Sequence, residues 1–152
     1  MSPVGIGYDS HRFAEGRRLV LGGVEIEHER GLAGHSDADV LVHAVIDALL
    51  GAACMGDIGT LFPDEEERWR DADSIDLLRT VVGTVPGRIV NIDATVVCEE
   101  PKLAPHRAEM ERVIAEATSA RVSVKATTNE GMGWIGRGEG IACMAVASVD
   151  SD

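Results

Sequence analysis

The sequence predicts an α+β fold in which helices cover one face of a mixed β-sheet, within a single domain spanning residues 1–152. Three observations support this fold class. Several segments alternate apolar and polar residues with a period of two, and others repeat apolar residues with the helical period. Their order along the chain is a strand, a hairpin, two helices, a strand, a helix and two final strands. At 152 residues the chain is also long enough to bury a core without disulfides.

The first half of the chain supplies the first strand, the hairpin and a long helix. In residues 4–9, apolar side chains alternate with glycine and aspartate, which predicts the strand. RRLVLGGVEIEH, residues 17–28, predicts two short strands joined at two glycines. Residues 36–55 predict a helix apolar on nearly every side and therefore buried, with Ser36 as N-cap and Asp39 completing a capping box.

The second half of the chain supplies a loop, two helices and three strands. Residues 56–67 predict a loop, broken by glycine and proline and ending in an acidic run. Helical periodicity covers residues 74–85 and 105–119, and strand patterns cover 87–100, 122–128 and 141–149. The last of these is apolar almost throughout, which a single layer of helices does not explain. We therefore expect the chain to oligomerise through its sheet.

Composition limits the classes of function. The formal net charge is −12 and Lys102 and Lys125 are the only lysines, so binding to nucleic acid is not expected. A small phosphorylated ligand remains compatible, if cations and backbone amides reverse the potential locally. The three cysteines are far apart in apolar runs, which is typical of free thiols in a reducing compartment. No apolar stretch approaches the roughly 20 residues that span a bilayer, so we expect a cytoplasmic protein.

Two segments carry candidate metal ligands. Asp9 and His11 stand two residues apart on the first strand, so they share a face, and glycines before them are expected to leave empty space there. His43 lies in the buried helix and needs a partner, which is either a metal ion or one of the helix neighbours Asp39 and Asp47. Together, Asp9, His11 and His43 form a ligand set that suits zinc or a similar divalent ion with one position open. A phosphate is expected at the amides of the helix start beside His35.

A glycine-rich segment follows, KATTNEGMGWIGRGEG, residues 125–140. It contains the letters of a dinucleotide-binding motif, but a strand follows where that motif requires a helix, so we reject that interpretation. Its amides and the hydroxyls of Thr127 and Thr128 suit a phosphate, and Glu130 suits a second cation. A flexible turn is the simpler alternative.

Four blocks taken together resemble one enzyme family, the 2-C-methyl-D-erythritol 2,4-cyclodiphosphate synthases of non-mevalonate isoprenoid biosynthesis. They are GYDSHRF, GHSDADVLVHAVIDALLGAACMGDIGTLFPD, PKLAPH and KATTNEGMGWIGRGEGIA, which span nearly the whole chain. The resemblance implies a CMP-releasing phosphorus–oxygen lyase. Its substrate is 4-diphosphocytidyl-2-C-methyl-D-erythritol 2-phosphate, whose 2-phosphate attacks the β-phosphorus. It also implies a homotrimer whose sheets surround the three-fold axis, with active sites between subunits.

The resemblance further implies roles for individual residues. Asp9, His11 and His43 bind Zn, Mn or Co, Glu130 binds Mg or Mn, and His35 and Thr128 stabilise the developing charge. The implied substrate contacts are Asp9, His11, His35, Ser36, Asp57, Ile58, Gly59, Phe62, Pro63, Asp64, Glu65, Glu66, Cys98, Glu99, Glu100, Pro101, Lys102, Leu103, Ala104, Thr127, Thr128, Asn129, Glu130, Trp134 and Arg137. Cytidine is expected against residues 98–104 of a neighbouring subunit and against residues 127–130.

Two other functions fit the same residues. A metal-dependent phosphohydrolase uses such ligands to activate water. A non-catalytic trimer with a structural metal could hold an isoprenoid-like ligand in a central apolar cavity.

Overall fold

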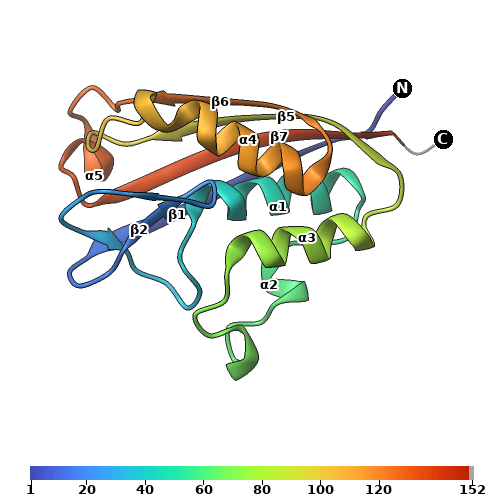
Figure 1. The fold of residues 1–152 in the computed structure, drawn as a ribbon, viewed down its shortest axis with the longest axis horizontal. Helices are drawn as coiled ribbons and strands as arrows, with labels where there is room; N and C mark the ends of the chain where they lie inside the picture. Colours follow the sequence, from blue (N-terminus) through green and yellow to red (C-terminus); the bar gives the residue numbers. More distant parts are fainter. Residues whose placement is uncertain (151–152) are drawn as a thin grey trace.

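A five-stranded mixed sheet is the central element of the fold in the computed structural model, which describes residues 1–150. The strands lie in the order β4-β1-β7-β5-β6, and only the β5–β6 pair is parallel. The strands are β1 (Val4–Ala14), β4 (Gly31–Leu32), β5 (Arg88–Val97), β6 (Arg121–Thr127) and β7 (Gly140–Asp150). The helices lie along one face of this sheet (Figure 1). The predicted α+β fold with a mixed sheet is confirmed.

The predicted hairpin forms a separate two-stranded sheet of β2 (Leu19–Leu21) and β3 (Val24–Ile26). Its turn residues Gly22 and Gly23 both have positive φ, 60° and 74°, the backbone region that glycine reaches without steric cost. β1, β7, β5 and β6 also match their predicted positions. The parallel β5–β6 pair needs a crossover, which is supplied by α4 (Arg107–Thr118) and the short 3₁₀ turn η2 (Ala104–His106).

Helix α1 (Val40–Ala52) lies directly against β1 because two strand glycines allow the backbones to touch. A Cβ at Gly5 would lie 2.0 Å from the carbonyl oxygen of Ala48, and one at Gly7 would lie 1.9 Å from that of Ala44. The expectation of empty space beside these glycines is therefore wrong. They bring α1 close to β1, and with it His43 close to Asp9.

The start of α1 also differs from the prediction, because the N-cap is Asp39 and not Ser36. Ala38 adopts a left-handed backbone with φ 58°, which separates Ser36 from the helix. The carboxylate of Asp39 accepts the N–H of Val42 and also the N–H groups of Gly22 and Gly23. Asp39 is completely buried, so the expected phosphate seat at an open helix start beside His35 is not formed.

The remaining helices are close to their predicted ranges, apart from short turns inside predicted loops. α3 (Ser74–Thr84) packs between α1 and α4. The loop at residues 56–67 contains α2 (Ile58–Leu61) and leads into the 3₁₀ turn η1 (Glu67–Trp69). The glycine-rich segment contains the single-turn helix α5 (Gly133–Gly136).

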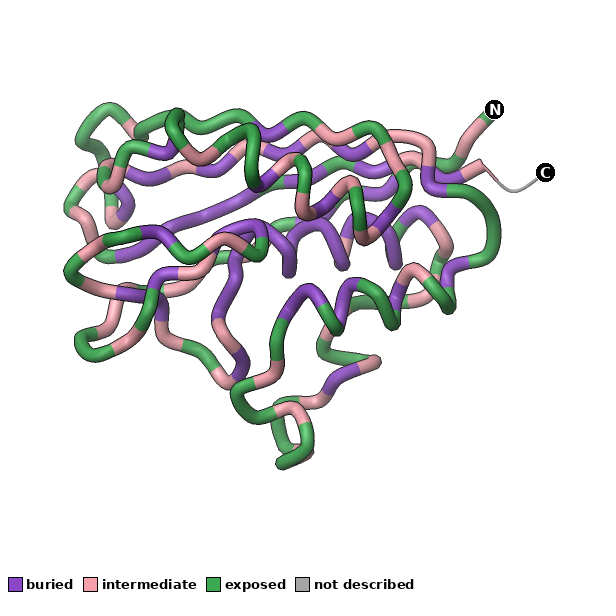
Figure 2. The backbone as a smooth tube through the Cα atoms, viewed as in Figure 1, coloured by how far each residue is buried: buried purple, intermediate pink, exposed green. Residues whose placement is uncertain are grey.

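The core lies between the sheet and the helices, and α1 is almost wholly buried within it (Figure 2). The opposite sheet face exposes a strip of large apolar side chains, which we call the outer sheet face: Val4, Ile6, Tyr8, Met144 and Val146. All three cysteines are free thiols. None of the helices within residues 1–150 has the length and apolar character needed to cross a membrane.

Candidate functional site

Asp9, His11 and His43 meet at one point between β1 and α1. Oδ2 of Asp9 lies 2.9 Å from Nε2 of His11 and 3.1 Å from Nδ1 of His43. The candidate ligand atoms of all three residues lie within 4.8 Å of one another. The sequence therefore located this cluster correctly, although the three residues come from segments more than 30 positions apart.

The hydrogen bonds around His11 leave a lone pair aimed into the cluster. Nδ1 of His11 lies 2.7 Å from the carbonyl oxygen of Ala33, which can only accept, so Nδ1 carries the proton. In a neutral ring Nε2 then holds a lone pair, yet it faces a carboxylate oxygen that also only accepts. Either a proton or a metal cation is needed between them.

His43 also faces Asp9 with one ring nitrogen, but here that nitrogen is Nδ1, whereas in His11 it is Nε2. Nε2 of His43 lies 2.9 Å from Oγ of Ser74 and 3.2 Å from Oγ of Ser36, while Nδ1 faces Asp9. The expected helix neighbours are not its partners, because Asp39 binds backbone N–H groups and Asp47 accepts the N–H of Ile58. The packing of α1 across β1, and not helical spacing, determines the contacts of His43.

The metal-free cluster is electrostatically coupled. Burial alone would raise the pKa of Asp9, but hydrogen bonds to both histidines and their charges lower it to about 2. Burial alone would lower the pKa of His11, but the hydrogen bond and charge of Asp9 raise it above the ordinary value of 6.5. Both shifts favour the charged forms, a carboxylate on Asp9 and an imidazolium on His11, which attract each other.

The residues fit a divalent metal ion. Two imidazole nitrogens and one carboxylate oxygen converge with their lone pairs, and their other nitrogens are held by hydrogen-bond partners. This set suits zinc and related ions, and with three protein ligands it leaves one position for another group. No other arrangement of three such residues was found among residues 1–150.

A cleft of about 230 Å³ opens beside the cluster and contains His35 and Ser36. Arg17 donates to the carbonyl oxygens of Gly34 and Ser36, which fixes the loop that carries His35. Nε2 of His35 is buried without a hydrogen-bond partner within the described chain. A residue that lines the cleft beside the metal ligands therefore carries a buried ring nitrogen with no protein partner among residues 1–150.

Residues of the α2 region divide between this cleft and other positions. Its wall includes Ile58, Gly59, Phe62 and Asp64, with Leu77 and Trp69. Asp57 instead caps α2 by accepting the N–H of Thr60. Among the substrate contacts predicted within residues 57–66, those that do not line this cleft are Asp57, Pro63, Glu65 and Glu66.

A second cleft, of about 280 Å³, gathers most of the residues expected at the cytidine, although Glu100, Asn129 and Glu130 are not among those that line it. It is lined by Cys98, Glu99, Pro101, Lys102, Leu103, Ala104, Arg107, Lys125, Ala126, Thr127 and Thr128. Glu99 accepts the N–H groups of Asn129 and Gly131, which ties the glycine-rich loop to the end of β5. Glu130 is exposed beside it. Within one chain, therefore, His35 and Thr128 line separate clefts.

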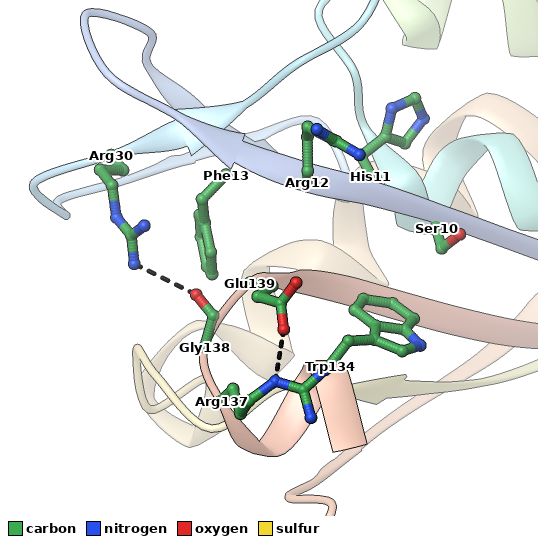
Figure 3. Close-up of a pocket in the computed structure, with 9 residues that line it drawn as sticks. All are labelled: Ser10, His11, Arg12, Phe13, Arg30, Trp134, Arg137, Gly138 and Glu139. Carbon is green, nitrogen blue, oxygen red and sulfur yellow. Dashed lines mark hydrogen bonds and ion pairs between the residues drawn. The ribbon is translucent and has the colours of Figure 1, made fainter.

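Trp134 and Arg137 line a third hollow at the end of β1, of about 700 Å³ (Figure 3). There Arg137 pairs with Glu139 at 2.6 Å, and Arg30 donates to the carbonyl oxygen of Gly138 and lies over the ring of Phe13. His11 borders both this hollow and the metal cleft.

Sequence reasoning missed Ser74 and Trp69. Ser74 is the first residue of α3, and a serine at the start of a helix does not suggest a functional role. Only the tertiary structure brings it to His43. Trp69 packs edge to face on Phe62 at 4.8 Å between ring centroids, and it lies just after residues 56–67, which the sequence predicts as a loop ending in an acidic run.

Comparison with known proteins decides the family. The model of the YgbB family matches residues 3–150. The chain belongs to the YgbB family. A relative from Salinibacter ruber, named 2-C-methyl-D-erythritol 2,4-cyclodiphosphate synthase, is 57% identical over 97% of this chain and 98% of its own length. One of the same name from Methylobacillus flagellatus is also 57% identical, over 98% and 97%.

Solved structures agree with this YgbB-family assignment. A 2C-methyl-D-erythritol-2,4-cyclodiphosphate synthase in its CDP-bound form superposes with a TM-score of 0.87 at 35% identity, covering 97% of this chain and 99% of that one. The bifunctional IspDF from Campylobacter jejuni gives a TM-score of 0.93 at 40% identity. It covers 99% of this chain, which spans only 43% of that longer protein. The resemblance seen in the sequence is confirmed.

Proposed function

We propose that this YgbB-family chain converts 4-diphosphocytidyl-2-C-methyl-D-erythritol 2-phosphate into 2-C-methyl-D-erythritol 2,4-cyclodiphosphate and CMP, in non-mevalonate isoprenoid biosynthesis in the cytoplasm. An oxygen of the 2-phosphate forms a bond to the β-phosphorus, and the bond from that phosphorus to the oxygen of the departing CMP breaks. The observation that carries the proposal is the convergence of Asp9, His11 and His43 beside a cleft lined by a histidine whose Nε2 has no partner within the described chain. The names of the relatives supply the reaction.

The protein's task in this reaction is to position anions. A phosphate oxygen is already ionised at neutral pH, so attack needs no strong general base, and the main barrier is repulsion between phosphates brought into line. Asp9, His11 and His43 would hold Zn, Mn or Co, and Glu130 would hold Mg or Mn. Bound there, such cations would supply positive charge that offsets this repulsion.

The other residues bind and orient the substrate. Ser36 and the α2 region, residues 57–59 and 62–66, contact the sugar portion, and Asp64 accepts from its hydroxyl groups. His35 and the hydroxyl of Thr128 donate hydrogen bonds to the charge that develops on the phosphates. Residues 98–104 and 127–130 hold cytidine and its phosphates, and Trp134 and Arg137 border the product.

We also propose that the working form is a homotrimer with active sites between subunits. The metal cleft and the proposed cytidine cleft share no residue within one chain, so a neighbouring copy must bring the second to the first. The outer sheet face exposes Ile6 at 71% and Tyr8 at 56%, and burying that strip provides apolar contact area. Ile6→Arg should yield monomers by analytical ultracentrifugation, whereas an unchanged trimer would contradict packing through the sheet.

The test of the reaction is a product assay followed by ³¹P NMR. The proposal expects one equivalent of CMP and a cyclic diphosphate from the substrate. CMP accompanied by linear phosphates would instead identify a phosphohydrolase, and substrate bound without turnover would identify a binding module.

The variant His43→Ala separates a catalytic ion from a structural one. A catalytic ion leaves a folded, inactive protein when lost, whereas a structural ion takes folding stability with it. We expect metal-free wild type and His43→Ala both to remain folded and to melt cooperatively, with activity absent in the variant; loss of the folded state in both would identify a structural ion.

A further inference from the structure

Next to Nε2 of His43 lies a hydrogen-bonded pair formed by Ser74, which is buried, and Asp37, which is half-buried. Ser74 has no exposed surface, and its Oγ lies 2.9 Å from Nε2 of His43. Asp37 accepts the hydroxyl of Ser74 through Oδ1 and the backbone N–H of Ser74 through Oδ2, the latter at 2.9 Å. Neither residue lines the metal cleft.

The direction of these hydrogen bonds follows from what each group can donate. A hydroxyl has one proton, and Ser74 gives it to the carboxylate of Asp37, which can only accept. The oxygen of Ser74 must therefore accept from His43, so Nε2 carries the ring proton. A neutral imidazole with its proton on Nε2 holds its lone pair on Nδ1, the nitrogen that faces Asp9.

We propose that Ser74 and Asp37 are positioning residues that fix the tautomer and the orientation of His43, so that Nδ1 is free to bind the metal of the proposed function. Asp37 also accepts the N–H of Asp39 at 3.1 Å, and its own N–H donates to Ala72. It thus joins the loop before α1 to the start of α3. Outer hydrogen-bond partners of this kind typically contribute 10- to 100-fold to metal affinity.

Ser36 offers a competing arrangement. Its Oγ lies 3.2 Å from Nε2 of His43 and accepts the N–H of Ala38, so its own hydroxyl proton could be given to Nε2. That would place the ring proton on Nδ1, where it would bond to Asp9 and block the metal. The pair Ser74 and Asp37 disfavours this state, because the oxygen lone pair of Ser74 and the ring lone pair on Nε2 would then face one another.

The experiment compares three variants. Ser74→Ala removes the acceptor of the Nε2 proton. Asp37→Asn keeps the size and shape of the side chain but replaces one carboxylate oxygen with an NH₂ group. That group can donate to Ser74, which reverses the direction of this hydrogen bond. Asp73→Ala is the matched control, since Asp73 caps the same end of α3 through the N–H of Ile75 and does not contact His43. It should destabilise the helix without changing His43.

Two readouts separate positioning from general damage. Nitrogen-15 NMR of the metal-free protein at pH 9, above the ordinary histidine pKa of about 6.5, reports which nitrogen of His43 is protonated. Isothermal titration with zinc reports the metal affinity. We expect the Nε2–H form to be more populated in wild type and Asp73→Ala than in Ser74→Ala and Asp37→Asn. We also expect roughly 10- to 100-fold weaker zinc binding in those two variants alone.

The outcomes are separable from those that test the proposed function. An Nε2–H population in wild type no larger than in Ser74→Ala and Asp37→Asn, or wild-type zinc affinity in both variants, would overturn the proposal. Equal loss of affinity in Asp73→Ala would do so as well, by assigning the effect to α3 stability. If Ser74→Ala does not fold, Asp37→Asn alone decides the matter. Failure of the synthase assay leaves the tautomer result unaffected, because that result is obtained without substrate or metal.

Discussion

Replacing Gly7 with alanine should separate the two elements that carry the metal ligands. Gly7 lies on β1 two residues before Asp9, and the new Cβ would lie 1.9 Å from the carbonyl oxygen of Ala44, the neighbour of His43. Restoring ordinary contact requires β1 and α1 to part by roughly 1.5 Å. Such overpacking typically costs about 1–3 kcal/mol of folding free energy.

The same displacement acts on the metal site. Nδ1 of His43 lies 3.1 Å from Oδ2 of Asp9, and metal–ligand distances tolerate only about 0.2 Å of change. A movement of roughly 1.5 Å therefore removes one ligand from reach, and we expect zinc affinity to fall by about 100-fold or more. The measurements are urea denaturation of the metal-free protein and calorimetric titration with zinc.

Gly83→Ala is the matched control. Gly83 is an exposed α3 residue with no atom within 4 Å of an added Cβ, so alanine should stabilise the protein by about 0.5–1 kcal/mol and leave zinc binding unchanged. If Gly7→Ala matched wild type in both stability and affinity, the close contact between α1 and β1 would be refuted as the cause of the site's geometry.

Three further predictions follow from individual side chains. Asp39→Ala should destabilise the protein by about 3 kcal/mol in urea denaturation, since it removes a helix cap and leaves buried backbone N–H groups unpaired; a loss below about 1 kcal/mol would contradict this. Zinc affinity should fall as pH drops through neutrality, because Asp9 raises the pKa of His11 above 6.5 and protons then compete for Nε2; titrations giving equal affinity at pH 5.5 and 8 would contradict histidine ligation. At pH 8 a thiol reagent should modify Cys54 rapidly and Cys98 slowly, since burial raises the pKa of Cys98 to about 11, and mass spectrometry of Cys54→Ser should show the rapid reaction abolished.

The sequence was sufficient for the features that depend on local patterns. The strands, the hairpin and the later helices follow from apolar periodicity and turn residues. The metal ligands could also be found, because Asp9 and His11 share a strand face and His43 is polar within an otherwise apolar helix.

What the sequence could not supply depends on how α1 crosses β1. Ser36 resembles a cap, but Asp39 replaces it because its carboxylate also binds the turn of the hairpin, a contact distant in sequence. Asp39 and Asp47 are the helical neighbours of His43, yet its partners are Asp9 and two serines from other segments. The backbone of α1 occupies the space beside the glycines of β1, and the periodicity of β1 does not reveal this contact.

X-ray absorption spectroscopy of the zinc-loaded protein in solution tests most directly whether the three side chains bind one ion. Two imidazole nitrogens and one carboxylate oxygen at about 2.0–2.2 Å from the zinc are predicted, with one imidazole lost in His43→Ala. A spectrum with sulfur at about 2.3 Å, or one identical in His43→Ala, would show that the ion binds elsewhere.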